Sequence, residues 1–336
     1  MPQPTRVSLV ALPEASISTL HGIHDVLGCF PAVRGVDPAI PDEEPFAVSI
    51  VAERAGPVTL AGGLKAEAQR GIGEVDDADI VIVPSVLLGP DGWQTGRYPA
   101  LVAWLARMHA RGAMLCSACS GVFLIAETGL LDGRAVTIHW IYERRFAALY
   151  PRVVLQPEQA LVVAGERAEL VSSGASMSWH DLVLYLVARV AGPAVAQSVA
   201  RFFALQWHRD GLGPYIVFEG RRDHGDALIL EAQRWLERHY PVPAPVEKMA
   251  QHTGLAERTF KRRFQAATGL APLAYVQHLR VEEAKRRLER GGEPVDEVGW
   301  RVGYEDSAFF RRLFRRITGV TPGQYRRQFQ MPTPGS

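Results

Sequence analysis

The chain has 336 residues, of which 47 % are hydrophobic and 22 % charged, a mixture typical of globular proteins with two or three domains at this length. Three cysteines are too few for a disulfide framework, and no apolar run reaches the roughly 18 residues of a membrane span. The run VSLVAL near the start is too short for a signal peptide. We therefore expect a cytoplasmic protein with no membrane partner.

Charge is unevenly distributed along the chain. Residues 227–336 hold 19 Lys and Arg against 12 Asp and Glu, a net charge of +7, whereas the remaining residues hold 18 against 24, a net charge of −6. An acidic first part joined to a basic last part indicates a sensor or enzyme tethered to a segment that binds a polyanion. The acidic run Asp-Asp-Ala-Asp at 76–79 is interpreted as solvated loop charge.

The first part of the chain alternates strand and helix patterns. Short apolar runs predict buried strands at residues 6–12, 46–53, 78–85 and 113–118. Helical periodicity predicts helices at residues 18–30 and 101–112. Residues 169–192 repeat the order strand, turn, helix, with Gly174 in the turn. This alternation predicts an α/β domain with a parallel sheet.

A sharp turn follows the fourth of these strands. In SACSG (117–121), small residues stand two places before and two places after Cys119, which is the spacing of a nucleophile elbow. The thiol is expected at a helix N-terminus, where the positive end of the helix dipole favours thiolate. The turn makes Cys119 a candidate nucleophile.

Residues 209–226 are rich in Gly, Pro and charge, and we interpret them as an interdomain linker. They separate the α/β domain at 1–208 from an all-α domain at 227–329, which is followed by a tail at 330–336. From Ala227 on, strand patterns vanish and only helical patterns remain.

The helical part repeats itself. MAQHTGL (249–255) corresponds to VGWRVGY (298–304) at an offset of 49, and FKRRFQAATGLAP (260–272) corresponds to FRRLFRRITGVTP (310–322) at an offset of 50. In each unit a small residue permits close helix approach, glycine forms the turn, and two phenylalanines four residues apart anchor the second helix. Each unit is therefore predicted to be a helix-turn-helix, with an amphipathic helix over 273–290 between the two.

The second helix of each unit carries basic residues on its outer face. A recognition helix enters the major groove of DNA, where Arg or Lys reaches guanine edges or phosphates. Residues 227–329, with their ending TGVTPGQYRRQF, resemble the DNA-binding domain of the AraC/XylS family of bacterial transcription regulators. By position, this resemblance implies base contacts from Arg258, Lys261, Arg262, Ser307, Arg311 and Arg312. Ala308 stands where a longer polar residue is often found, and the alternative is that the basic residues form a solvated helix face.

The first part resembles a second family. LIAETGLLDGR (124–134), AVTIHW (135–140) and VSSGASMSWHDLVLYLV (171–187) are similar to the DJ-1/PfpI branch of the class I glutamine-amidotransferase-like fold, a flavodoxin-type sandwich, over residues 6–208. The version fused to an AraC-type domain is often called GlxA-like. In the enzymes of this superfamily an acidic residue projects toward the thiol from the helix after the first strand, and here Thr19 occupies that place. The proteolytic branch has His directly after the cysteine, where this chain has Ser120.

Because two catalytic partners are missing, the resemblance implies a pocket that binds a small molecule without turning it over. Such a pocket lies at the carboxyl ends of the parallel strands. Its predicted lining is Thr19, Ser85, Cys119, Ser120, His139 and Ser176. Two other interpretations of Cys119 remain, a small buried residue retained for packing and a working nucleophile.

No metal or cofactor is expected. Cys116 and Cys119 form a CxxC with no second pair, and His21 and His24 lack a third ligand at good spacing. No glycine-rich phosphate-binding loop is present in the sequence.

These observations together predict a ligand-responsive, sequence-specific transcription regulator in the bacterial cytoplasm, associated with the nucleoid through DNA. The expected partners are double-stranded operator DNA, a small-molecule effector, a second copy of the chain in a homodimer, and RNA polymerase. The protein is not expected to be an enzyme. The alternative is a DJ-1/PfpI-type cysteine hydrolase or hydratase fused to a DNA-binding domain.

Overall fold

The computed structural model describes residues 3–331. Internal packing divides the chain into two units, Met1–Leu212 and Gly213–Ser336. The boundary falls inside the expected linker 209–226, and residues just before it still bond to the first unit, since the Leu212 backbone N–H donates to Glu158 O at 2.7 Å. Within the described residues, no helix combines the length and the apolar character that crossing a bilayer requires.

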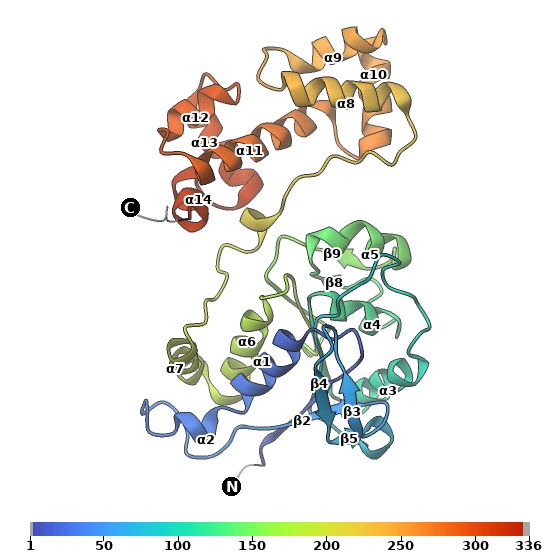
Figure 1. The fold of residues 1–336 in the computed structure, drawn as a ribbon, viewed down its shortest axis with the longest axis vertical. Helices are drawn as coiled ribbons and strands as arrows, with labels where there is room; N and C mark the ends of the chain where they lie inside the picture. The colour runs from blue at the N-terminus through green and yellow to red at the C-terminus, as the bar shows by residue number, and fades with distance from the viewer. Residues whose placement is uncertain (1–2, 332–336) are drawn as a thin grey trace. The chain divides into compact units, whose positions relative to one another are not determined.

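The first unit is built on a mostly parallel sheet (Figure 1) with the strand order β10-β11-β7-β6-β1-β2-β5. Neighbouring strands pair in parallel except β10, which is antiparallel to β11 at one edge. The strands are β1 (Thr5–Val10), β2 (Phe46–Ala52), β5 (Arg70–Gly71), β6 (Ile80–Val83), β7 (Met114–Ala118), β10 (Leu161–Ala164) and β11 (Leu170–Ser173). The four strands expected from apolar runs correspond to β1, β2, β6 and β7, so the α/β prediction is confirmed.

Two small sheets and a set of helices complete this unit. The small sheets pair β3 (Gly56–Thr59) with β4 (Lys65–Ala68), and β8 (Ala135–Val136) with β9 (Val154–Leu155). The helices are α1 (Ile17–Leu27), α2 (Phe30–Val33), α3 (Pro99–Ala110), α4 (Val122–Ala126), α5 (Glu143–Leu149), α6 (Trp179–Ala191) and α7 (Pro193–Phe203). Figure 1 shows α1 and α6 on one side of the strands and α3 and α4 on the other. This arrangement is the expected three-layer sandwich.

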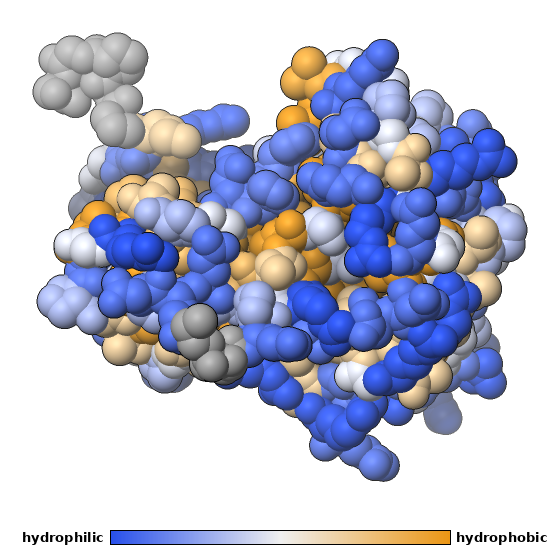
Figure 2. All heavy atoms as spheres, turned by 90° about the horizontal axis from the view of Figure 1, so that it is seen from below, coloured by the Kyte–Doolittle hydropathy of each residue, from blue (hydrophilic) through white to orange (hydrophobic). Residues whose placement is uncertain are grey.

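The core explains the continuous apolar runs of the central strands. Both faces of the parallel sheet are covered by helices, and all four residues of β6 are at most 3 % exposed. Trp104, Phe123 and Phe146 are fully buried in the same contiguous core. The surface seen in Figure 2 is mostly hydrophilic, with hydrophobic side chains showing between the charged ones.

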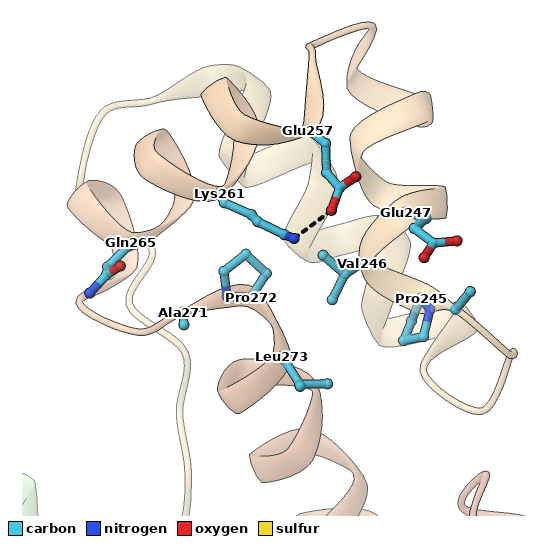
Figure 3. A pocket seen from close by; sticks show the side chains of 10 residues that line it. Pro245, Val246, Glu247, Glu257, Lys261, Gln265, Ala271, Pro272 and Leu273 are labelled. Carbon is cyan, nitrogen blue, oxygen red and sulfur yellow. Dashed lines mark ion pairs between the residues drawn. The ribbon is translucent and has the colours of Figure 1, made fainter.

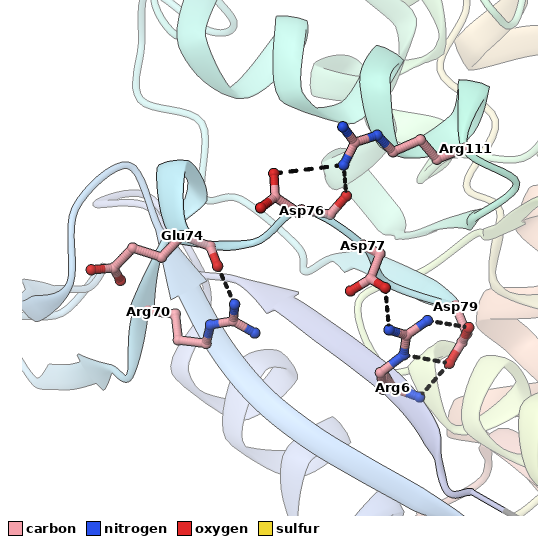
Figure 4. A network of polar contacts seen from close by, with 7 residues as sticks. All are labelled: Arg6, Arg70, Glu74, Asp76, Asp77, Asp79 and Arg111. Atoms are coloured by element: carbon pink, nitrogen blue, oxygen red, sulfur yellow. Dashed lines mark hydrogen bonds and ion pairs between the residues drawn. The ribbon is translucent and has the colours of Figure 1, made fainter.

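A polar network joins loops next to β1 (Figure 4). Arg6 donates from its backbone N–H and its guanidinium to the Asp79 carboxylate at 2.8–3.1 Å and pairs with Asp77 at 2.5 Å. Arg111, directly after α3, pairs with Asp76 at 3.6 Å. The Arg6 guanidinium lowers the pKa of Asp79. The charges of the run 76–79 are exposed, as expected, and the fold in addition places two arginines beside them.

The second unit contains, in the described residues, seven helices (Figure 1). They are α8 (Ala227–His239), α9 (Pro245–Thr253), α10 (Glu257–Thr268), α11 (Pro272–Arg290), α12 (Val295–Arg301), α13 (Ser307–Thr318) and α14 (Pro322–Phe329). Two separate cores form, the first among α8, α9, α10 and the start of α11, and the second among the end of α11, α12, α13 and α14. The bridging helix expected at 273–290 is α11, which contributes Val276 to the first core and Leu288 to the second.

Residues 213–221, which we call the strap, pack against α11 although they lie in the expected linker. The Lys285 ammonium donates to the backbone oxygen of Ile216 at 2.5 Å and to the Glu282 carboxylate at 2.8 Å. The Lys285 side chain is only 5 % exposed, so the Glu282 carboxylate neutralises a buried cation and the strap supplies it with a further hydrogen-bond acceptor.

Aromatic rings fix the strap at both of its ends. The Tyr215 ring lies 5.0 Å from the ring of Phe329 in α14, and Phe218 lies 5.1 Å from Tyr275 in α11. Phe329 packs against the second core and Tyr275 belongs to the first. The strap therefore contacts both halves of the second unit.

Candidate DNA-binding surface and the Cys119 site

The first helix-turn-helix unit consists of α9, a turn at Gly254 and α10. Gly254 adopts φ +68°, a left-handed conformation that glycine adopts without strain. Phe260 and Phe264, one turn apart on α10, are fully buried in the first core, and Ala250 on α9 is 4 % exposed. The small residue, the glycine turn and the phenylalanine anchors have the roles expected from their spacing.

The second unit repeats this arrangement with α12, a turn at Gly303 and α13. Gly303 adopts φ +95°, and a Cβ built on Gly299 in α12 would lie 2.8 Å from the Phe310 ring, so a larger side chain would push the helices apart. Phe310 and Phe314 are fully buried. Asp306 caps α13, because its carboxylate accepts the backbone N–H groups of residues 308 and 309 at 2.8 and 3.0 Å. Sequence reasoning missed this cap, although an Asp before a helix is a recognised signal.

The residues predicted to contact bases differ in how free their side chains are. Arg258, Arg262 and Arg312 are exposed and make no hydrogen bond or ion pair with any residue in the range 3–331. Arg311 donates to the Asp296 carboxylate at 2.8 Å, so it must give up an ion pair before it reaches DNA. Ser307, at the start of α13, is half-buried. Contacts from these residues to DNA remain predictions.

Lys261 occupies a different environment on the flank of α10. It forms an ion pair with Glu257 in the same helix, and both side chains line a cavity of about 430 Å³ (Figure 3). The start of α9 and the start of α11 close this cavity with Val246, Pro272 and Leu273. Lys261 therefore starts from an ion-paired position, unlike its neighbour Arg262 in the sequence.

In the first unit of the chain, Cys119 lies in a strained turn between β7 and the short 3-10 helix η2 (Cys119–Gly121), which leads into α4. Its φ is +49°, in the left-handed region that residues other than glycine rarely adopt. A Cβ on Gly121 would lie 2.5 Å from the backbone oxygens of Val83 and Pro84, so only glycine fits there. The elbow geometry expected from the small flanking residues is present.

The environment of the thiol opposes thiolate formation. Cys119 is 1 % exposed, and burial raises its pKa, which outweighs the thiolate-favouring effect expected from the helix N-terminus. Its Sγ lies 3.9 Å from Ser176 Oγ and faces the backbone of His139. Ser120 is tied to Val86, donating to its backbone oxygen at 2.6 Å and accepting from its N–H at 3.0 Å. These four predicted lining residues thus converge around one turn.

His139 is not placed to act as a base for the Cys119 thiol. Its Nδ1 accepts a hydrogen bond from the backbone N–H of Ile141 at 3.2 Å, and burial lowers its pKa. A neutral imidazole that accepts at Nδ1 carries its proton on Nε2 and can only donate there. Glu14, the acidic residue nearest in sequence to Thr19, has its carboxylate engaged by Tyr98.

Thr19 and Ser85 contribute buried hydroxyls that lack partners. Within the described residues, neither Thr19 Oγ1 nor Ser85 Oγ forms a hydrogen bond, although the side chains are only 1 % and 2 % exposed. The backbone N–H of Ser16 donates to Ser85 O at 2.8 Å, which holds the start of α1 beside the end of β6. Buried polar groups in native proteins are nearly always hydrogen-bonded, so two unpaired hydroxyls in adjacent segments are notable.

Two family models match the chain. The DJ-1/PfpI family matches residues 39–187, which include Cys119. A helix-turn-helix domain matches residues 249–328, which include α10 and α13.

Curated relatives match the chain over most of their own length. HTH-type transcriptional regulator CdhR of Pseudomonas aeruginosa is 26 % identical over 294 residues, 84 % of this chain and 82 % of its own. HTH-type transcriptional regulator GlxA of Rhizobium meliloti is 25 % identical over 226 residues, 67 % of this chain and 68 % of its own. The crystal structure of an AraC family transcriptional regulator from Pseudomonas putida has the same fold, with a TM-score of 0.50 at 21 % identity over 60 % of this chain and 100 % of that one. The chain therefore carries a DJ-1/PfpI-family domain followed by an AraC-type helix-turn-helix domain, and it is similar over most of its length to HTH-type transcriptional regulators.

Proposed function

We propose that this protein regulates transcription by binding operator DNA through both helix-turn-helix units. The observation that carries the proposal is the mounting of two such units on one helix, each with its phenylalanines buried and a basic face turned outward. With 19 residues, α11 is about 28 Å long, comparable with the roughly 34–36 Å between successive major grooves. A helix of this length separates the two units by most of the distance between neighbouring grooves.

Footprinting of the full-length protein on genomic DNA tests this proposal. We expect two protected segments about 10 base pairs apart on a limited set of sequences. This protection should persist at about 0.2 M salt, where non-specific binding weakens strongly. Equal binding to all sequences at matched salt would contradict it.

We further propose that Thr19, Ser85, Cys119, Ser120, His139 and Ser176 line an effector site. The unpaired buried hydroxyls of Thr19 and Ser85 support this, because a ligand would supply the hydrogen bonds that the protein does not. Since both side chains are almost fully buried, a ligand reaches them only when covering segments move. It alters DNA binding only if it binds two arrangements of the protein with different affinity.

Thermal-shift measurements with a metabolite library test the effector site. A ligand at 100 times its Kd stabilises a protein by about 2.7 kcal/mol. We expect a stabilising compound to act on the wild type and to lose its effect in the Thr19→Val, Ser85→Ala double variant. Ser198→Ala is the matched control, because that buried hydroxyl already donates to Ala194 O at 3.2 Å. A compound that stabilises all three proteins equally contradicts the assignment.

The DJ-1/PfpI domain belongs to a superfamily of enzymes, so a cysteine hydrolase or hydratase is the alternative. The raised pKa of Cys119 and the accepting Nδ1 of His139 weigh against it. Cys119→Ala separates the two functions. Intact DNA binding and effector response in this variant support a non-catalytic domain, whereas turnover of a small molecule that only the wild type achieves contradicts it.

The proposal includes a homodimer, contact with RNA polymerase at promoters, and a cytoplasmic, nucleoid-associated location. Each chain of a dimer binds one copy of the site, so the two-fold symmetry of the dimer is mirrored in the operator. Light scattering of the purified protein should give twice the chain mass of 37.0 kDa. The mass of a single chain at micromolar concentration contradicts the dimer.

A further inference from the structure

Arg280 interrupts the apolar stripe of α11. Val276, Arg280, Ala284 and Leu288 follow one another at four-residue intervals on the buried face of this helix. Arg280 is 8 % exposed, whereas arginine is almost never buried without partners. It lies between the residues that α11 gives to the first core and those it gives to the second.

The guanidinium uses three of its N–H groups on backbone oxygens. Nε donates to Tyr240 O at 2.8 Å, and the two terminal nitrogens donate to Val242 O and Gly303 O, each at 3.0 Å. The Tyr304 ring covers the cation at 4.9 Å from its centroid. Among residues 3–331, no carboxylate forms an ion pair with Arg280, so carbonyl dipoles and the ring compensate its charge.

These acceptors come from both halves of the second unit. Tyr240 and Val242 follow the C-terminal end of α8, which packs in the first core, and Gly303 follows the C-terminal end of α12, which packs in the second. The C-terminal ends of helices carry partial negative charge, which suits a buried cation. A Cβ on Gly303 would lie 2.7 Å from Pro241 O, so the turn of the second helix-turn-helix rests directly on the loop after α8.

We propose that Arg280 is a positioning residue that fixes the orientation of the second helix-turn-helix relative to the first, and thereby makes the protein selective for the spacing between its two half-sites. The proposal rests on the proposed function, binding of DNA through both units. Helix α11 sets a separation along its axis, and its packing in the second core orients α12 and α13 about that axis. The guanidinium stiffens this orientation because it joins the loop after α8 to the turn at Gly303.

DNA geometry makes spacing selectivity the sensitive readout. One added base pair displaces the second half-site by about 3.4 Å and rotates it by roughly 35° about the duplex. Only a stiff joint between the two units penalises such a change. A purely stabilising role for Arg280 would lower affinity for every spacing in the same proportion.

The experiment measures Kd of the full-length protein, at one salt concentration, for the footprinted operator and for versions with one base pair added or removed between the half-sites. For the wild type we expect the altered spacings to bind at least about tenfold more weakly, since a misplaced half-site loses base contacts. Arg280→Lys keeps the charge but loses the three-pronged hydrogen bonding, and Arg280→Met keeps only the stem. In both variants the Kd for an altered spacing, divided by the Kd for the original spacing, should fall to within about threefold of unity. Most of the tenfold discrimination would then be lost.

Two further variants keep the test decisive. Arg286→Met is the matched control on α11, because that side chain is half-exposed and pairs with Glu283, and it should retain the wild-type ratio. Tyr304→Leu removes the ring over the guanidinium but no backbone acceptor, and it should lower the ratio in part, so it decides the question if the Arg280 variants do not fold. A wild-type ratio in folded Arg280 variants, or in Tyr304→Leu when those do not fold, overturns the proposal. Absence of specific binding by the wild type itself would instead refute the proposed function.

Discussion

The two helix-turn-helix units begin their second helices in different ways. Between the turn glycine and the first anchoring phenylalanine, the second unit has one residue more than the first, and its second helix is capped by Asp306. The equivalent position in the first unit is Ala256, which offers no side-chain cap. The same fold is thus reached with a capped helix in one unit and with an uncapped helix beside a cavity in the other. Duplicated units need to share their core spacing but not their local stabilisation.

Their basic faces differ as well. In the first unit Arg258 and Arg262 are both exposed without ion pairs, whereas in the second Ala308 takes the place of Arg258, and Arg311 is held by Asp296. Among the residues predicted to contact bases, the first unit therefore offers two arginines without an ion pair and the second offers one, Arg312. From these residues we expect the first unit to contribute more to base recognition; α13 also exposes Arg315, outside the predicted set.

The phenylalanine anchors should give the largest effects. Phe260→Ala and Phe310→Ala each remove a fully buried ring, which should lower the free energy of unfolding by about 3–5 kcal/mol. Urea unfolding of the full chain measures this, with Phe202→Ala, a half-exposed ring on α7, as the control. A loss below about 1 kcal/mol in either unit would show that its core is not packed as described.

The arginines that form no ion pair should give the next largest effects. Arg262→Ala and Arg312→Ala should each weaken operator binding by about 1–3 kcal/mol if they contact bases. Fluorescence anisotropy at matched salt measures the loss, and Arg107→Ala, an exposed position on α3, serves as control. Wild-type affinity in both variants would refute the assignment of the recognition faces.

The ion-paired cations should matter less. Lys261→Ala and Arg311→Ala each remove a side chain that must first leave an exposed ion pair, so we expect a loss in operator affinity below about 1 kcal/mol. The same anisotropy assay ranks them against Arg262→Ala. A larger loss for Lys261→Ala than for Arg262→Ala would mean that the flank over the cavity faces DNA.

The helix cap should give the smallest effect and a defined pH dependence. Hydrogen bonds from the backbone N–H groups of residues 309 and 308 lower the pKa of Asp306, so its stabilisation is present above the ordinary Asp value of about 4 and is lost as pH falls through the lowered pKa. Asp306→Ala should therefore lower the melting temperature at pH 7 and have a smaller effect at pH 3. Glu305→Ala, an exposed neighbour, is the control. An effect of equal size at both pH values would exclude the cap as its cause.

Local patterns accounted for most of the fold. Apolar runs located β1, β2, β6 and β7, and the spacing of glycines and phenylalanines located both helix-turn-helix units, because these signals depend only on neighbours in the chain. The protonation state of the Cys119 thiol could not be predicted in the same way. Its turn geometry is local, but its pKa depends on how burial competes with the helix terminus, and burial is a property of the whole fold.

Long-range contacts account for what was missed. The strap has the composition of a linker, and its attachment depends on Lys285 and Tyr275, which lie more than fifty residues further along the chain. Arg280 did leave a signal, since a lone arginine at a four-residue interval within an apolar stripe is unusual. The ion pairs of the run 76–79 were missed because Arg6 lies in β1, 73 residues before Asp79.

The strap also determines at which residue a stable fragment containing the DNA-binding domain must begin. A fragment that starts at Ala227 keeps every helix from α8 to α14 but removes the carbonyl that accepts from Lys285 and the ring that packs on Tyr275. A buried ammonium without that acceptor weakens the middle of α11, the helix that both cores share. The independently folding module therefore begins at Gly213, ahead of its first helix, and limited proteolysis should leave an intact fragment that retains residues 213–221.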